Sequence, residues 1–202
     1  MTQLKNKNTH SMDKVRSFIA IETNEELESS LNELIEKLER MGFKANWTRT
    51  KNIHLTLFFL GDQKMEKIAE LAYKIGERVS GFPTFHFNIN KIGYFENSSI
   101  PKVLWLGIEE EQSLIGLSEE IKKVLSISNL EFKNDIFVPH ITVGRVKSNP
   151  NHWRELIKTI NFDQIRVYVN SIGIYSSELT RKGPIYKKLY TVDFEGGVII
   201  NG

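Results

Sequence analysis

Cysteine is absent from the 202-residue sequence, which excludes disulfides, thiolate metal sites and a cysteine nucleophile. Long apolar runs are absent too. No segment approaches the roughly 20 apolar residues that span a bilayer, and the polar start MTQLKNKNTHSMDKV contains no signal-peptide core. Neither sign of charge dominates, because 27 Lys and Arg nearly balance 25 Asp and Glu and leave a net charge of +2. We therefore expect a cytoplasmic protein that has no membrane segment and is not a dedicated nucleic-acid coat protein.

The composition that remains is typical of one globular domain. Apolar residues make up 40% and charged residues 26% of a chain that is long enough to bury a single good core. Residues 1–13 are polar and show no apolar periodicity, so we predict a disordered tail there. Residues 14–202 are predicted to form one bilobal domain, a monomer that needs no protein partner.

Two successive segments repeat one order of predicted elements: strand, helix, strand, helix, strand. Four leucines at helical spacing between residues 27 and 38 predict the first helix, and apolar alternation predicts the strands. The first copy has strands at 16–22, 47–62 and 85–95 and helices at 24–42 and 65–79. The second copy has strands at 102–109, 137–146 and 165–177 and helices at 110–127 and 150–160, and a Gly-Pro turn with a closing strand follows at 181–196.

The two copies share details that element order alone does not require. Both contain His-apolar-Thr-apolar in the middle strand, at His54 and His140. Both third strands carry an Ile-Gly phrase, at Gly93 and Gly173. These shared details indicate an internal duplication.

Two fused copies of such a module pack naturally about a pseudo-twofold axis. We therefore predict an α+β fold in which a duplicated β-α-β-α-β module forms two lobes of mostly antiparallel sheet, with helices on the outside. The lobes are expected to be built largely from residues 14–98 and 99–196. In this arrangement the two His-x-Thr faces look at each other across a central groove.

The two His-x-Thr pairs indicate proton-transfer chemistry. Side chains alternate along a strand, so His54 and Thr56 share one face, as do His140 and Thr142. Two imidazoles near neutral pH can hold opposite protonation states, so one removes a proton while the other delivers one. In-line displacement at phosphorus needs both transfers, on opposite sides of the phosphoryl group.

Further side chains in the same strands suit a phosphate. The hydroxyls of Thr56 and Thr142 can donate hydrogen bonds to its non-bridging oxygens. Arg145, five residues beyond the second histidine, can clamp it through two N–H groups. Phe58, two residues beyond Thr56 and on the same face, is expected to contact the groove.

Taken in order, these motifs resemble those of the two-histidine phosphoesterases, which are named for paired H-x-[ST]-x motifs. The resemblance runs from Arg16 to about Phe194, and RSFIAIE, HLTLFFLG, PKVLWLGI, VPHITVGR and YSSEL carry it. Within that superfamily the chain is most similar to the RNA 2′,3′-cyclic phosphodiesterases, also called 2′-5′ RNA ligases.

The resemblance implies a reaction and a role for each motif residue. By similarity, water opens a 2′,3′-cyclic phosphate at an RNA terminus and leaves a 2′-phosphomonoester, without a metal or other cofactor, and reversal allows 2′-5′ ligation. The resemblance implies that His54 and His140 are catalytic and that Thr56, Thr142 and Arg145 bind the phosphate. By analogy His54 activates the water and His140 protonates the departing 3′ oxygen.

The second motif departs from the family pattern at two positions. Val143 and Gly144 stand where relatives often have leucine and alanine. Glycine weakens a strand interior, so we expect Gly144 to loosen the strand just before Arg145.

Two other functions fit the same residues. One is a two-histidine phosphodiesterase that acts on another small cyclic phosphate or a 2′-5′ oligonucleotide, and the other is a non-catalytic RNA-binding module.

Basic residues near the motifs and the C-terminal turn are either solvated loop tips or contacts to an RNA backbone: Arg49, Lys51, Lys147, Arg181, Lys182, Lys187 and Lys188. The remaining histidines, His10, His86 and His152, have no partner at ligand spacing, so no metal site is expected.

Overall fold

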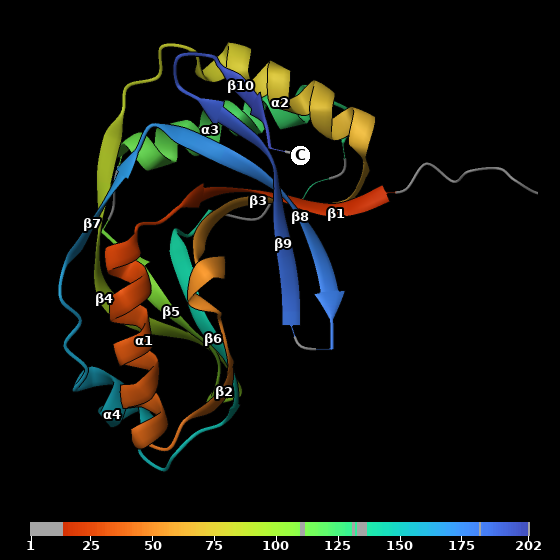
Figure 1. Cartoon of the computed structure of the whole chain (residues 1–202). Coiled ribbons are helices and arrows are strands. Elements are labelled where there is room, and N and C mark those ends of the chain that lie inside the picture. The colour runs from red at the N-terminus through yellow and green to blue at the C-terminus, as the bar shows by residue number, and fades with distance from the viewer. Residues whose placement is uncertain (1–13, 110–111, 131, 133–136, 182, 202) are drawn as a thin grey trace, which may run out of the picture.

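The computed structural model describes residues 14–109, 112–130, 132, 137–181 and 183–201 (Figure 1). The tail predicted over residues 1–13 lies outside these residues. The described chain forms two five-stranded sheets in which every described strand pair is antiparallel. This arrangement agrees with the predicted α+β class.

The first sheet has the order β10-β9-β8-β1-β3 and the second has the order β2-β6-β5-β4-β7. The strands of the first sheet are β1 (Lys14–Glu22), β3 (His54–Lys64), β8 (Ser171–Thr180), β9 (Gly183–Asp193) and β10 (Val198–Ile200). Those of the second sheet are β2 (Lys44–Trp47), β4 (Phe85–Asn97), β5 (Ile100–Ile108), β6 (His140–Ser148) and β7 (Ile165–Val169).

Each copy of the module contributes all or part of its third strand to the sheet that holds the motif of the other copy. β4 ends the first copy but pairs with β5 and β7 in the second sheet. The third strand of the second copy, predicted over 165–177, divides at Asn170 into β7 in the second sheet and β8 in the first. The strands of the two sheets therefore do not follow the expected boundary between residues 14–98 and 99–196, because the chain crosses between the sheets within each copy.

The first helix, α1 (Glu25–Arg40), forms where the leucine spacing predicted it. Asn24 caps it by accepting a hydrogen bond from the backbone N–H of Leu27 at 3.1 Å. The four leucines on its apolar face are buried. The chain leaves the helix through Gly42, whose φ of +94° lies in the region that favours glycine.

The other helices cover the sheets from outside. α2 (Met65–Val79) contacts α3 (Gln112–Ile127) and also β3, β9 and β10. Figure 1 shows α2 and α3 together over the first sheet, and α1 and the short α4 (Trp153–Lys158) beside the second. A 3₁₀ turn, η1 (Thr50–Asn52), separates β2 from β3 within the span predicted as one strand. None of the described helices is long and apolar enough to cross a membrane.

One continuous hydrophobic cluster lies beneath both sheets. It includes Leu55 of β3, Ile141 of β6, Leu31 of α1 and Ile75 of α2. Leu55 and Ile141 each follow a motif histidine directly, so the alternation that buries them turns the histidines to the opposite face. The motif strands are therefore anchored in a shared core.

We expect Leu31→Ala to lower the free energy of unfolding by about 2–5 kcal/mol, because it leaves a cavity at a fully buried position. Urea denaturation followed by circular dichroism measures this change. Glu33→Ala, at an exposed position of the same helix, is the control and should change stability by less than about 0.5 kcal/mol. Equal effects of the two substitutions would contradict the assigned burial of this helix face.

Candidate active site

β3 and β6 bring the two motifs together where the sheets meet. The two strands contact each other although they belong to different sheets. Thr48, just after β2, holds the second motif strand in place, since its hydroxyl donates a hydrogen bond to the carbonyl oxygen of Thr142 at 2.8 Å. A groove of about 1070 Å³ lies here, and all six predicted site residues line it: His54, Thr56, Phe58, His140, Thr142 and Arg145.

The two histidines are held by the same local hydrogen bond. Nδ1 of His54 lies 2.6 Å from the carbonyl oxygen of Asn52, and Nδ1 of His140 lies 2.8 Å from that of Val138. A carbonyl oxygen can only accept, so Nδ1 must carry the hydrogen in both rings. This bond fixes each tautomer and leaves Nε2 as the ring nitrogen that can take up and release a proton.

Aromatic rings pack against His54. Its ring centroid lies 4.9 Å from that of Phe18 and 5.3 Å from that of Tyr186. Tyr175 stacks on Phe18 at 5.2 Å and lies 6.5 Å from the ring of His54, and its hydroxyl donates to a carboxylate oxygen of Glu22 at 2.8 Å. Burial lowers the pKa of His54 below its ordinary value of 6.5, although the bond to Asn52 acts in the opposite direction. The neutral form of His54 is therefore favoured near pH 7.

Aromatic rings pack against His140 in a similar arrangement. Its ring lies 5.1 Å from Phe95, edge to face, and 6.5 Å from Trp105. Phe95 and Tyr175 each lie two residues after the glycine of an Ile-Gly phrase. The duplication predicted from sequence thus extends to the rings behind the histidines.

The Ile-Gly phrases leave room for these rings. A Cβ atom at Gly93 would clash with the ring of Trp105, and a Cβ atom at Gly173 would clash with the ring of Tyr175. Both glycines have negative φ, so close approach and not backbone conformation requires them.

A β-bulge in each motif strand re-aims the residue that lies five positions after the histidine. The β1–β3 pairing skips Leu57, and the β5–β6 pairing skips Val143. Each skipped residue directly follows the motif threonine. Beyond the bulge the alternation of faces reverses, so Phe59 and Arg145 become exposed in equivalent places and both line the groove. One half of the groove therefore offers a cation where the other offers an aromatic ring.

Phe58 lies mainly in the core. Its side chain is 6% exposed, and its ring lies 6.0 Å from that of Phe132. We expected Phe58 on the face of Thr56, whereas the bulge turns it inward so that it contributes only part of the groove wall. Phe59, 48% exposed, occupies the position that alternation had assigned to Phe58.

Gly144 has a packing role. A Cβ atom there would clash with the indole of Trp47, which lies opposite it in the β2–β6 ladder. Nε1 of Trp47 donates a hydrogen bond to Glu39 at 2.7 Å and so fixes the ring. The expected loosening before Arg145 is offset by this ring, because Trp47 occupies the space that the glycine leaves.

Positive charge is concentrated in the groove. Arg16, Arg49, Arg145 and Arg181 line it, and none of its lining residues within the described chain is Asp or Glu. Because the whole chain carries a net charge of only +2, this concentration is local. A low-dielectric cleft lined by one sign of charge attracts ligands of the opposite sign. The groove is therefore suited to an anionic ligand.

Some predicted basic residues and histidines lie elsewhere. Lys51, Lys147, Lys187 and Lys188 are not among the groove's lining residues, and Lys182 and His10 lie outside the described residues. Lys188 instead pairs with Glu22 at 2.6 Å. His86 faces Tyr168 at 4.9 Å in a separate cavity of about 360 Å³, and His152 precedes α4.

Sequence reasoning missed Arg16 and Phe18 and assigned no role to Tyr186. Arg16 and Phe18 belong to β1, whose pairing with β3 brings them beside the first motif. The apolar run RSFIAIE directly before the first helix is the signal for this strand, but alternation does not reveal its neighbours. Burial raises the pKa of Tyr186, and the nearby charges of Arg145 and Arg16 act in the opposite direction but are outweighed. The hydroxyl of Tyr186 therefore stays protonated and can donate a hydrogen bond.

Comparison with known proteins identifies the family. The model of the 2′-5′ RNA ligase superfamily matches residues 27–181. The chain belongs to the 2′-5′ RNA ligase superfamily. It is 49% identical to a Thermotoga maritima protein named RNA 2′,3′-cyclic phosphodiesterase, over 92% of this chain and 98% of that protein. An Archaeoglobus fulgidus protein of the same name is 30% identical, over 87% and 98% respectively.

Solved structures show the same fold. LigT of E. coli in its apo form has a TM-score of 0.70 at 25% identity and covers 89% of this chain and 96% of its own. TT0787 of Thermus thermophilus has a TM-score of 0.72 at 23% identity and covers 90% and 98%. These likenesses confirm the predicted fold class, and the family match confirms the resemblance to two-histidine phosphoesterases.

We expect Gly173→Ala to lower the free energy of unfolding by about 1–3 kcal/mol, because the added methyl must displace the Tyr175 ring behind His54. Gly116→Ala is the matched control. Its Cβ would meet only Phe82 at 3.8 Å, and alanine favours a helix interior, so stability should hold or rise. Thermal unfolding of both variants checks the prediction, and unchanged stability of Gly173→Ala would contradict the close approach.

Proposed function

We propose that this chain hydrolyses 2′,3′-cyclic phosphates at RNA termini to 2′-phosphomonoesters by paired histidine acid–base catalysis, without a metal cofactor. The observations that carry the proposal are that His54 and His140 line one groove and that each has Nδ1 held by a backbone carbonyl, which leaves both Nε2 atoms available for proton transfer. The names of the Thermotoga and Archaeoglobus relatives support the choice of substrate.

The two histidines differ in a way that suggests their roles. The aromatic rings around His54 favour its neutral form, which can accept a proton from water. Water then attacks phosphorus and its oxygen forms the new P–O bond, while the bond from phosphorus to the 3′ oxygen breaks on the opposite side. Protonated His140 gives its Nε2 proton to that departing oxygen. The 2′ oxygen keeps the phosphate.

Thr56, Thr142 and Arg145 stabilise the charge on the non-bridging oxygens in this proposal. The two hydroxyls lie beside the imidazoles in the same groove, and the bulge in β6 turns Arg145 toward it. If an RNA 5′ hydroxyl takes the place of water, His54 accepts its proton, its oxygen forms the new bond to phosphorus and the bond to the 3′ oxygen breaks, so the same groups join two ends through a 2′-5′ linkage.

The product identifies the reaction. We expect RNA ending in a 2′,3′-cyclic phosphate, incubated with the protein in EDTA, to gain a terminal 2′-phosphate. His54→Ala and His140→Ala should each reduce turnover roughly 100-fold to 10,000-fold, with binding largely unchanged. His86→Ala, outside the groove, is the control. A 3′-phosphate product, loss of activity in EDTA, or full turnover by either histidine variant would contradict the proposal.

The pH dependence separates the two roles. If His54 is the base, kcat/KM falls as His54 becomes protonated. Because burial lowers the pKa of His54, the acidic limb should have its midpoint below 6.5. Phe18→Ala opens the aromatic surroundings, weakens this lowering and should move the acidic limb to higher pH. An acidic limb that stays in place in Phe18→Ala would show that another group titrates there.

A further inference from the structure

The hairpin formed by β8 and β9 extends past the strand that supports it. β1 pairs with β8 only over Gly173–Ser176, whereas β8 and β9 go on pairing from Ser177–Tyr186 to Thr180–Gly183. Figure 1 shows the two blue strands running beyond β1 and β3. Residues 177–181 and 183–186, called here the hairpin arm, therefore form a two-stranded wall beside the groove.

Local hydrogen bonds hold the arm in place. The hydroxyl of Thr180 donates to the carbonyl oxygen of Gly183 at 2.6 Å and closes the turn. Nδ2 of Asn52 donates to the carbonyl oxygen of Pro184 at 3.2 Å and ties the arm to the segment before His54. The arm is thus positioned relative to the catalytic groove.

The two faces of the arm differ. Ser177, Leu179, Pro184 and Tyr186 line the groove, as do Thr180 and Gly183 near the turn, whereas Glu178 and Ile185 on the other face, and Lys187 just after the arm, do not. Alternation along paired strands explains this division. The groove face begins at Tyr186, beside His54, and continues outward to Leu179, which is 68% exposed.

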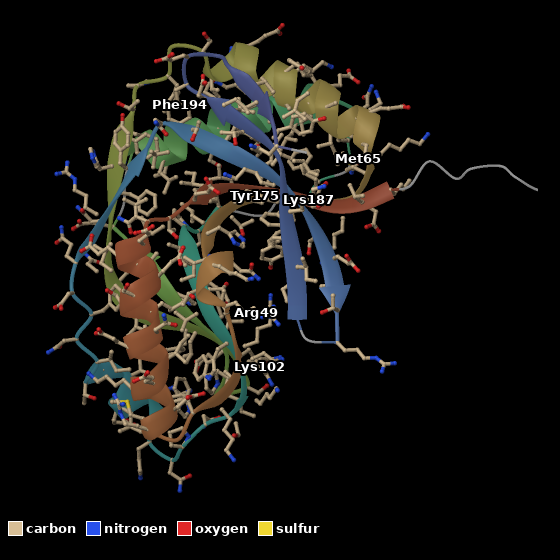
Figure 2. All side chains as sticks on the ribbon, in the orientation of Figure 1. Arg49, Met65, Lys102, Tyr175, Lys187 and Phe194 are labelled. Carbon is tan, nitrogen blue, oxygen red and sulfur yellow. The ribbon has the colours of Figure 1, made fainter. Side chains whose placement is uncertain are left out.

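A positively charged side chain lies at the outer end of the groove face of the arm. Arg181, at the turn, lines the same groove. It lies four positions after Ser177, which is about 13 Å at the rise of 3.3 Å per residue in a strand. Arg49, also a lining residue, lies between the second sheet and the arm in Figure 2. Arg181 is therefore placed for an anionic group other than the phosphate that reacts at His54.

We infer that the hairpin arm binds the nucleotide that precedes the terminal one in an RNA strand, with Leu179 and Pro184 against its sugar and base and Arg181 at its phosphate. The inference rests on the proposed function and extends it, because it makes an oligonucleotide end, and not a cyclic mononucleotide, the preferred substrate.

Charge favours a nucleic acid strand over a peptide as the occupant. The lining combines arginines with exposed apolar side chains and has no carboxylate among its described residues. Binding of single strands uses this combination, since cations attract the backbone and apolar or aromatic groups contact the bases.

The test compares the mononucleotide 2′,3′-cyclic CMP, called cyclic CMP below, with a trinucleotide that ends in a 2′,3′-cyclic phosphate. The wild-type kcat/KM should be at least about tenfold higher for the trinucleotide. Arg181→Ala should lower that value about tenfold, the loss expected for one charged hydrogen bond, and leave cyclic CMP within about twofold. Lys187→Ala removes the same charge from the opposite face of the same hairpin, and it should leave both substrates unchanged. Equal rates on both substrates, or equal losses in both variants, would overturn the inference.

A binding measurement keeps this result separate from the proposed function. Fluorescence anisotropy of a labelled trinucleotide with a terminal 2′-phosphate reports binding whether or not any cyclic phosphate is opened. Arg181→Ala should weaken binding about tenfold and reduce the slope of log Kd against log salt by about 1, and Lys187→Ala should not. Identical binding by the two variants would refute the hairpin site even if hydrolysis is found. Absence of hydrolysis with weakened binding by Arg181→Ala would refute only the proposed reaction.

Discussion

The exchange of third strands between the two copies is the constraint on which the groove depends. β4 lies beside β5, and β8 lies beside β1, so each exchanged strand enters the sheet that holds the other copy's motif. Phe95, from the first copy, therefore backs His140, and Tyr175, from the second, lies behind Phe18 and His54. Neither half of the chain contains the complete surroundings of its own histidine, and the shared hydrophobic core binds the halves further.

The duplication places two similarly held histidines in one groove, and the differences between the two copies distinguish them. The same hydrogen bond orients both imidazoles, but His54 lies among Phe18, Tyr175 and Tyr186 and has a lowered pKa. Beyond the bulges, one copy offers Arg145 where the other offers Phe59. The duplicated halves thus present two different sides to a ligand in the groove.

The sequence alone predicted the duplication, the α+β class and the positions of both motifs in strands. It was not sufficient for the strand exchange, because periodicity identifies a strand but not its partners. Arg145 was assigned from its chemistry, although strict alternation would turn it away from His140, and only the bulge at Val143 reconciles the two. The same kind of bulge moved Phe58 into the core, since one skipped residue reverses every face beyond it.

Asn52 serves two parts of the molecule at once. Its carbonyl oxygen accepts the hydrogen bond that fixes the tautomer of His54, and its side chain donates to Pro184 in the hairpin arm. The three-residue turn η1 ends at this asparagine. One residue therefore anchors both the outer wall of the groove and the orientation of the imidazole at its inner end.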